Sequence, residues 1–221
     1  MDKTILHKIS INRSVQGLSL WINHDSTISC YYSVISKAKN EVKVISSQSF
    51  DGLEKISKII SRESPLHLSI DGRGILYRII NNSDEAPDIK EILPSARPSE
   101  FYVQSTKISD SKRLISIVRK EHIDAILSEF NLNDIYPQSV HLGPLIIVPY
   151  INLIRGHTIS LPRYIIETEN GLILSISRTE QNSSVRMLNI GEDKISSEYL
   201  FAFFSSLFGY LNTLYLDTWA S

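Results

Sequence analysis

The stretch LSLWINHDSTISCYYSVISKAKNEVKVISSQSF, from Leu18 to Phe50, decides the fold of this 221-residue chain. It contains three runs rich in β-branched and aromatic residues, at 18–22, 28–35 and 42–48. Two short polar segments separate these runs, at 23–26 and 36–40. Because apolar runs bounded by turn residues are typical of strands, the stretch predicts three consecutive strands joined by short turns.

The next residues predict a helix followed by a hairpin. After Asp51, apolar residues recur at helical spacing, which is typical of an amphipathic helix packed on a sheet. Residues 66–70 and 75–80 are strand-like and flank Asp71-Gly72-Arg73-Gly74. Since Asp-Gly tolerates the positive φ that tight hairpins need, we expect these two strands to pair with each other.

The rest of the chain repeats the opening order of elements. Strands are expected at 101–107, 113–118 and 135–142, a clear helix at 119–130, and a helix broken by Pro149 at 143–154. Three strands and a helix then follow, at 164–168, 172–177, 184–190 and 196–216. The repeat predicts an α/β protein of two related halves, residues 15–155 and 160–221, with the second half incomplete and the chain a fragment of a longer protein.

Composition excludes several classes of function. Twenty-three basic and 24 acidic side chains leave a formal charge of -1, so no overall field attracts a nucleic acid. Cys30 is the single cysteine, which excludes an internal disulfide or a cysteine zinc site and favours a reducing, cytoplasmic compartment.

The C-terminal apolar segment, 199–216, is uncharged and about long enough to cross a membrane. It contains several serine, asparagine and threonine residues, and acidic Glu198 and Asp217 flank it where a span usually has basic residues. We therefore expect a buried or docking helix and no membrane span in this chain.

No motif supports catalysis, a metal site or a cofactor. The six histidines lack metal-ligand spacing, and the chain has neither a P-loop nor a Gly-x-Ser-x-Gly nucleophile elbow. Gly72-Arg73-Gly74 joins two expected strands, whereas a dinucleotide fingerprint joins a strand to a helix. The sequence therefore predicts a protein that is not an enzyme.

Four residues are candidates for a protein interface. Arg119 and Lys120 follow an expected strand and belong either to a solvated strand end or to a site for an anionic partner. Phe101 and Tyr102 lie beside Pro98, where loop-flanking aromatics belong either to an interface or to the core.

Five segments, taken in order, resemble a known family. They are LHLSIDGRGIL (66–76), ILP (92–94), EFYVQ (100–104), ISIVRK (115–120) and HLGP (141–144). Together with the repeated order of elements, they resemble the actin-like cytoplasmic domain of PilM and GspL-type proteins of type IV pilus and type II secretion assembly platforms. The resemblance covers about residues 18–215 and implies two ribonuclease H-like halves, in which active members hold ATP between glycine-containing turns.

This chain departs from the family at both turns. Asn23 lies near the family's aspartate position and Asp25 where glycine is expected, and Glu167 and Glu169 lie in the corresponding second turn, beside Gly171. A carboxylate about 4 Å from a phosphate charge costs about 4 kcal/mol at an effective dielectric constant near 20. We therefore expect two degenerate nucleotide turns and no bound nucleotide.

The resemblance implies a scaffold that docks a secretion or pilus motor ATPase and a membrane-anchored platform subunit, with a homodimer also open. Such a domain is cytoplasmic and peripheral to, or tethered at, the inner membrane. Two alternatives remain: an ATP-binding actin-like pilus assembly ATPase, and a ribonuclease H-like nuclease, which needs clustered carboxylates for two metals.

Overall fold

The computed structural model describes residues 14–38, 41–81, 89–179, 184–190 and 193–219. Its largest sheet has five strands in the order β3-β2-β1-β4-β8. These strands are β1 (Ser14–Ile22), β2 (Ile28–Ala38), β3 (Glu41–Asp51), β4 (Leu66–Gly72) and β8 (Ser139–Leu142). The first three form an antiparallel meander, and β4 and β8 run parallel to β1. The predicted α/β class is therefore confirmed, with a mixed five-stranded sheet in the N-terminal part.

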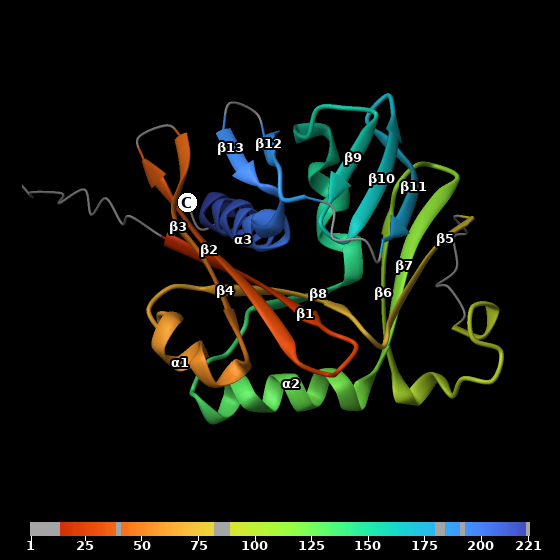
Figure 1. The fold of residues 1–221 in the computed structure, drawn as a ribbon, viewed down its shortest axis with the longest axis horizontal. Coiled ribbons are helices and arrows are strands. Elements are labelled where there is room, and N and C mark those ends of the chain that lie inside the picture. The colour runs from red at the N-terminus through yellow and green to blue at the C-terminus, as the bar shows by residue number, and fades with distance from the viewer. Residues whose placement is uncertain (1–13, 39–40, 82–88, 180–183, 191–192, 220–221) are drawn as a thin grey trace, which may run out of the picture.

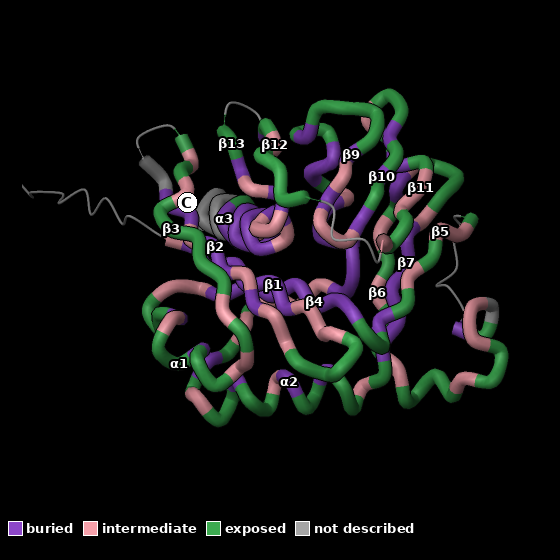
Figure 2. The backbone as a smooth tube through the Cα atoms, in the orientation of Figure 1, coloured by how far each residue is buried: buried purple, intermediate pink, exposed green. Residues whose placement is uncertain are grey.

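Helices cover both faces of this sheet (Figure 1). On one face lie the short helices η1 (Leu53–Lys55) and α1 (Ile56–Ile59), together with α2 (Lys120–Leu132). On the other lies α3 (Leu200–Trp219). All seven residues of β4 are buried, which is typical of a parallel strand covered on both faces. Figure 2 shows this burial concentrated in β1, β4 and the first half of α3.

Alternation along β1 separates two cores. Leu18 and Leu20 pack with Ile126 and Phe130 of α2, whereas Gly17 faces α3. A Cβ atom at Gly17 would overlap the backbone of α3 at Ala202 and Ser206, so glycine lets the helix approach the strand closely. The predicted helix at the C-terminal end is thus a buried helix that packs on the N-terminal sheet.

The predicted pairing of 66–70 with 75–80 is wrong. β5 (Ile75–Asn81) belongs to a separate sheet of order β5-β7-β6, with β6 at Phe101–Lys107 and β7 at Lys112–Arg119. Both edges of β4 are already paired, with β1 and β8, so no edge remains for β5. The chain leaves the first sheet at Gly72 and Gly74, whose φ values are 110° and 85°.

Two short helices, η2 (Ile89–Glu91) and η3 (Pro98–Glu100), lie between β5 and β6. A third, η4 (Gly143–Leu153), connects β8 to the C-terminal part. The last is a 3₁₀ helix where a broken α-helix was expected, and Pro149 lies inside it. Its residues are largely buried between the sheets.

The C-terminal strands form two small sheets. One has the order β11-β10-β9, from β9 (Thr158–Leu161), β10 (Tyr164–Glu169) and β11 (Leu172–Arg178). The other is the hairpin of β12 (Met187–Ile190) and β13 (Asp193–Ser196), followed by η5 (Ser197–Tyr199). The strand expected at 184–190 therefore pairs within this hairpin and does not extend the first sheet.

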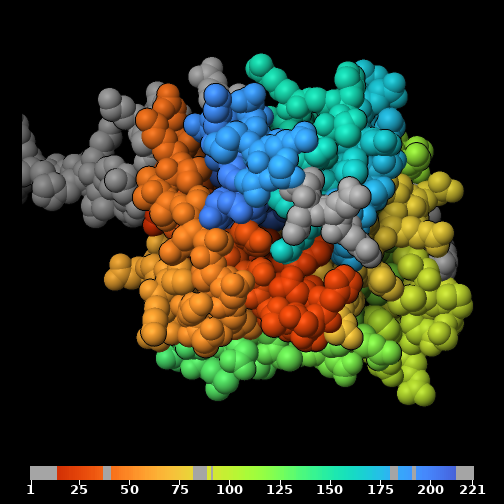
Figure 3. Space-filling view, viewed as in Figure 1, coloured from red at the N-terminus to blue at the C-terminus, as the bar shows by residue number. Residues whose placement is uncertain are grey.

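The two predicted halves share one core. Val15 and Ile35 of the N-terminal sheet belong to the same buried cluster as Tyr164 of β10 and Phe204 of α3. Figure 3 shows the C-terminal strands stacked directly on the N-terminal sheet. The division at residues 15–155 and 160–221 stays a prediction, within which α3 completes the first half rather than the second.

Candidate functional site

The β1–β2 turn uses its own polar groups internally. The backbone N–H groups of Asn23 and Ser26 donate to the carbonyl oxygens of Thr27 and Asn23, at 2.8 and 3.1 Å. Asp25 Oδ1 accepts hydrogen bonds from both the backbone N–H and the hydroxyl of Thr27, at 3.0 and 2.6 Å. Phosphate binding needs backbone N–H groups that point outward and are free to donate. In this turn a carboxylate already accepts one of them.

The charge of this turn also opposes a phosphate. The hydrogen bonds from Thr27 hold the pKa of Asp25 below its ordinary value, so the carboxylate is ionised near neutral pH. Arg73 does not neutralise it, because its guanidinium donates to His24 O at 2.7 Å and to Ser26 Oγ at 3.2 Å. The turn is thus a self-bonded loop tied to the end of β4.

The second predicted turn lies elsewhere. Glu169 ends β10 in an exposed position, and Glu167 accepts a hydrogen bond from Ser175 Oγ at 2.9 Å. Gly171 has φ 76° and abuts the side chain of Asn152. Figure 1 places this β10–β11 turn at the opposite end of the molecule from the β1–β2 turn. The two turns do not face each other, and their assignment as degenerate nucleotide turns stays a prediction.

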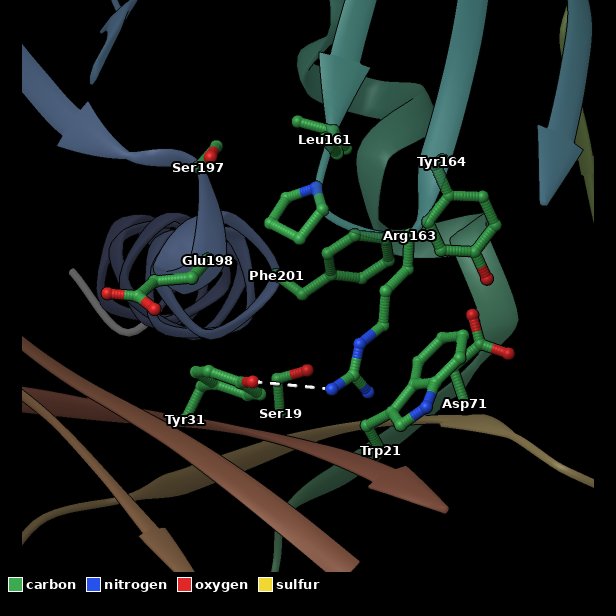
Figure 4. A pocket seen from close by; sticks show the side chains of 11 residues that line it. Ser19, Trp21, Tyr31, Asp71, Leu161, Arg163, Tyr164, Ser197, Glu198 and Phe201 are labelled. Atoms are coloured by element: carbon green, nitrogen blue, oxygen red, sulfur yellow. Dashed lines mark hydrogen bonds between the residues drawn. The ribbon is translucent and has the colours of Figure 1, made fainter. Parts of the chain in front are cut away.

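A pocket lies between the N-terminal sheet and the C-terminal part (Figure 4). Its accessible volume is about 40 Å³, room for a few water molecules. The N-terminal sheet contributes Ser19 and Trp21 from β1, Tyr31 from β2 and Asp71 from β4. The C-terminal part contributes Leu161, Pro162, Arg163, Tyr164, Ser197, Glu198 and Phe201. The pocket is therefore aromatic, with an arginine at its centre.

A buried ion pair supports one wall. Arg178 Nη2 donates to Asp71 Oδ1 at 2.5 Å, and the same guanidinium donates to Ile75 O at 3.3 Å. Its carbon lies 5.4 Å from the ring centroid of Trp21 and 5.2 Å from that of Tyr77. Burial raises the pKa of Asp71 to about 6, although Arg178 and the Gly72 N–H act in the opposite direction.

Arg163 is held differently. Its guanidinium carbon lies 4.3 Å from the ring centroid of Trp21, and Nη2 donates to Tyr31 Oη at 3.4 Å, a long hydrogen bond. Nη1 is buried and has no hydrogen-bond partner among the described residues. Burial lowers the pKa of Arg163, while Tyr31 and Asp71 act in the opposite direction. Arg178 thus has a carboxylate and a carbonyl oxygen as acceptors, whereas Arg163 has one long hydrogen bond among the described residues.

Neither Arg163 nor Arg178 could be predicted as a site residue from sequence spacing. Arg163 and Arg178 are 15 positions apart, and neither belongs to a motif. The available signal was the register of the expected strands 164–168 and 172–177, because pairing across that hairpin sets Tyr164 opposite Arg178. The contact with Trp21 and Asp71 had no local signal.

The four predicted interface residues do come together. Phe101 pairs with Arg119 across β6 and β7, and the guanidinium carbon lies 5.3 Å from the Phe101 ring centroid. Lys120 Nζ lies 5.5 Å from the Tyr102 ring centroid, and Tyr102 donates to Asp124 Oδ1 at 2.9 Å. We call Phe101, Tyr102, Arg119 and Lys120 the cation–π cluster. It is largely exposed, and its interface role stays a prediction.

Neither a metal site nor a membrane-spanning helix is found among the described residues. No group of three histidine, cysteine, aspartate or glutamate side chains could hold a metal among the described residues. The described helices include none that is both long enough and apolar enough to cross a membrane. Burial raises the pKa of the Cys30 thiol to about 12, as expected of an inert core cysteine.

Comparison with known proteins returned similar structures alone. No protein-family model and no curated protein sequence matches the chain. One similar structure is the cytoplasmic domain of EpsL, an inner membrane component of the type II secretion system of Vibrio cholerae. It is 9% identical with a TM-score of 0.48, over 74% of this chain and 71% of that one.

A second similar structure is a Bacteroides thetaiotaomicron protein with an actin-like ATPase fold and unknown function. It is 13% identical with a TM-score of 0.43, over 76% of this chain and 71% of that one. The kind of protein that the sequence resembles is thus also found among the similar solved structures.

Proposed function

We propose that this chain is a non-catalytic, actin-like scaffold in the inner-membrane assembly platform of a type II secretion or type IV pilus system. It docks the motor ATPase on one surface and a membrane-anchored platform subunit on another. It acts in the cytoplasm, peripheral to or tethered at the inner membrane. The choice of system follows the ordered sequence segments that resemble PilM and GspL-type proteins.

The observation that carries this proposal is the self-bonded β1–β2 turn. Its Thr27 N–H donates to the Asp25 carboxylate, so the donor that a phosphate needs is occupied and an anion is fixed beside it. A sheet of this order without a phosphate-binding turn retains surfaces for assembly but lacks the means to hold ATP. This supports a scaffold over the alternative, an ATP-binding pilus assembly ATPase.

The cation–π cluster supports protein docking. Aromatic and arginine side chains are enriched in protein interfaces, and here Tyr102 and Arg119 are exposed beside half-buried Phe101 and Lys120. Arg119 is paired with Glu100 at 3.7 Å, so Lys120 supplies the positive charge for an acidic segment of a partner, to which we assign this surface.

Thermal melting with Mg-ATP tests the absence of nucleotide binding. A nucleotide at 100 times its dissociation constant stabilises a protein by about 2.7 kcal/mol. We expect no change in Tm with millimolar Mg-ATP. A clear rise would instead favour the ATPase alternative.

Binding to the host's motor ATPase and platform subunit tests docking. We expect Tyr102→Ser to weaken one of these complexes by about tenfold, as loss of an interface aromatic does. Tyr136→Ser is the matched control, since Tyr136 is also exposed, at 68%, but lies outside the cluster. If neither partner is bound by the unmodified chain, the scaffold proposal fails.

A further inference from the structure

We propose that the second half of α3, from Phe208 to Trp219, is held on the N-terminal sheet by a proton-sensitive contact with His67 and His141. The segment lies on the sheet while both imidazoles are neutral, and it leaves the sheet when they take up protons in mild acid. This device is independent of the scaffold role and of the β1–β2 turn.

The contact contains two histidines that share one hydroxyl. His67 lies on β4 and His141 on β8, and Ser139 Oγ is 2.8 Å from His67 Nδ1 and 3.3 Å from His141 Nε2. A hydroxyl has one proton, so it can donate to one ring nitrogen and accept from the other. The arrangement therefore suits two neutral rings, because two imidazolium rings would both donate to the same oxygen and bring two positive charges together.

The helix α3 covers both rings. The ring centroid of Phe208 is 6.0 Å from that of His67 and 4.4 Å from that of His141. Gly209 packs directly on His67, since a Cβ atom at this glycine would lie 2.1 Å from His67 Nε2. That nitrogen is buried and has no hydrogen-bond partner among the described residues. A charged imidazole needs an acceptor for each of its two N–H groups, so protonated His67 lacks one while α3 lies on it.

No charged side chain among the described residues offsets a proton on this pair. β1, η4 and residues 200–216 of α3 contain no acidic or basic residue, and β6 has only Lys107, at its end. Asp71 follows on β4 but is paired with Arg178. Burial therefore lowers the pKa of both His67 and His141 to about 4, and the charge of His67 adds to the effect at His141.

The two halves of α3 differ in how firmly they are packed. Phe204 and Ser206 are fully buried, and the first half makes the close backbone contact at Gly17. In the second half Leu211 and Asn212 are already exposed. Local opening begins where the fewest buried contacts resist it, so release should start at Phe208 and leave the first half in place.

The sign of the pH effect follows from the lowered pKa values. Both histidines have a pKa of about 4 when covered, below the ordinary 6.5, so packing favours the neutral rings. Their contribution is complete above about pH 6.5 and is lost as pH falls toward about 4. Between about pH 7.5 and about pH 5, each histidine should raise the equilibrium constant for opening by up to about 30-fold. The raised pKa of Asp71 favours the folded protein in acid, so it acts in the opposite direction.

Hydrogen exchange of the whole chain at about pH 7.5 and about pH 5 tests this proposal, with each rate divided by the intrinsic rate of an unprotected amide at that pH. We expect the protection of residues 208–219 to fall at least about 30-fold in acid, which is the effect of one histidine. The amides of residues 202–206 should stay protected at both pH values.

Variants of the two histidines identify the proton acceptors. The double variant His67→Asn with His141→Gln is neutral at both pH values and should keep residues 208–219 protected in acid. His157→Asn is the matched control, because His157 is exposed and lies outside the contact, and it should respond as the unmodified chain does. Thermal melting at about pH 7.5 confirms folding. If the double variant does not fold, each single variant should lose about half of the response on a logarithmic scale, since the two protonation steps multiply.

Three results would each overturn the proposal. They are equal protection of residues 208–219 at both pH values, an unchanged acid response in the histidine variants, or a parallel loss of protection at residues 202–206, which would mean that the fold opens as a whole.

Discussion

Arg178 and Arg163 lie on the same tryptophan and have opposite surroundings. Both guanidinium carbons stand near the Trp21 ring, at 5.4 and 4.3 Å. Arg178 binds the buried carboxylate of Asp71 and the carbonyl of Ile75, whereas Arg163 has one long hydrogen bond to a phenol. Two arginines near the same aromatic rings therefore differ in their partners: Arg178 pairs with a buried carboxylate, and Arg163 does not.

The difference shows what gives an arginine in this region a structural role: a buried carboxylate that needs a partner. A buried carboxylate must be paired, because leaving it alone is costly, and Arg178 satisfies that need from another sheet. Arg163 forms no ion pair with a carboxylate among the described residues; its hydrogen bond goes to Tyr31, and the charge of Asp71 acts on it from farther away. The contacts of Arg178 thus join the N-terminal sheet to β11, while Arg163 packs on Trp21 with one long hydrogen bond.

The largest effect is expected for Arg178→Met. This change leaves Asp71, which is 3% exposed, without its cation, and breaking one side of a buried pair typically costs about 3–5 kcal/mol. Urea unfolding at pH 7 measures the loss. A loss below about 1 kcal/mol, the range of exposed pairs, would mean that the pair does not hold the two sheets together.

Asp71→Asn should have a smaller effect, of about 1–3 kcal/mol at pH 7. The Arg178 side chain is 32% exposed, so water can solvate its charge when the carboxylate is gone, and the new amide oxygen still accepts a hydrogen bond. The same unfolding experiment compares both variants. If Asp71→Asn were the more damaging of the two, the cation and not the carboxylate would be the group that requires its partner.

The pH dependence of this second variant sharpens the comparison further. The pKa of Asp71 is about 6 in the folded protein, above its ordinary value of 3.8, so folding favours the protonated carboxyl. This contribution to stability is present below about pH 3.8 and is lost as pH rises through about 6. The deficit of Asp71→Asn relative to the unmodified chain should therefore shrink as pH rises across that window. A constant deficit between pH 4 and pH 7 would contradict the raised pKa.

The smallest effect is expected for Arg163→Gln. Since Arg163 makes one long hydrogen bond and packs on Trp21 without an ion pair, its loss should lower the free energy of unfolding by about 1 kcal/mol. Thermal and urea unfolding both measure this change. A loss close to that of Arg178→Met would break the comparison and make Arg163 a structural residue.

Much of the local structure could be predicted from the sequence. The alternation and turns of residues 18–50 predicted β1, β2 and β3, and the apolar spacing of 119–130 predicted α2, because both signals depend on neighbours a few residues apart. The 3₁₀ form of η4 was missed, since Pro149 indicated a broken helix without indicating its type. The predicted pairing of β4 with β5 was wrong, because the two edges of β4 are taken by β1 and β8, which are distant in the sequence.

Some features of the candidate sites could likewise be predicted from the sequence, whereas others needed the structure. The composition of the β1–β2 turn, with Asp25 and no glycine, is a property of the sequence and already indicated poor phosphate binding. That Asp25 binds Thr27 and that the β10–β11 turn lies at the far end needed the structure. The pocket itself gathers side chains from β1, β2, β4, the β9–β10 turn and α3, which no local pattern links.

The sequence by itself thus determined the first three strands, α2, the α/β class, the single cysteine and the carboxylate in the first turn. The tertiary structure alone decided that α3 lies on the N-terminal sheet at Gly17, and that Arg178 rather than Arg163 meets Asp71. The physical reason is range: hydrogen-bond periodicity and turn chemistry act over a few residues, whereas the pairing of a buried charge depends on which distant segments pack together.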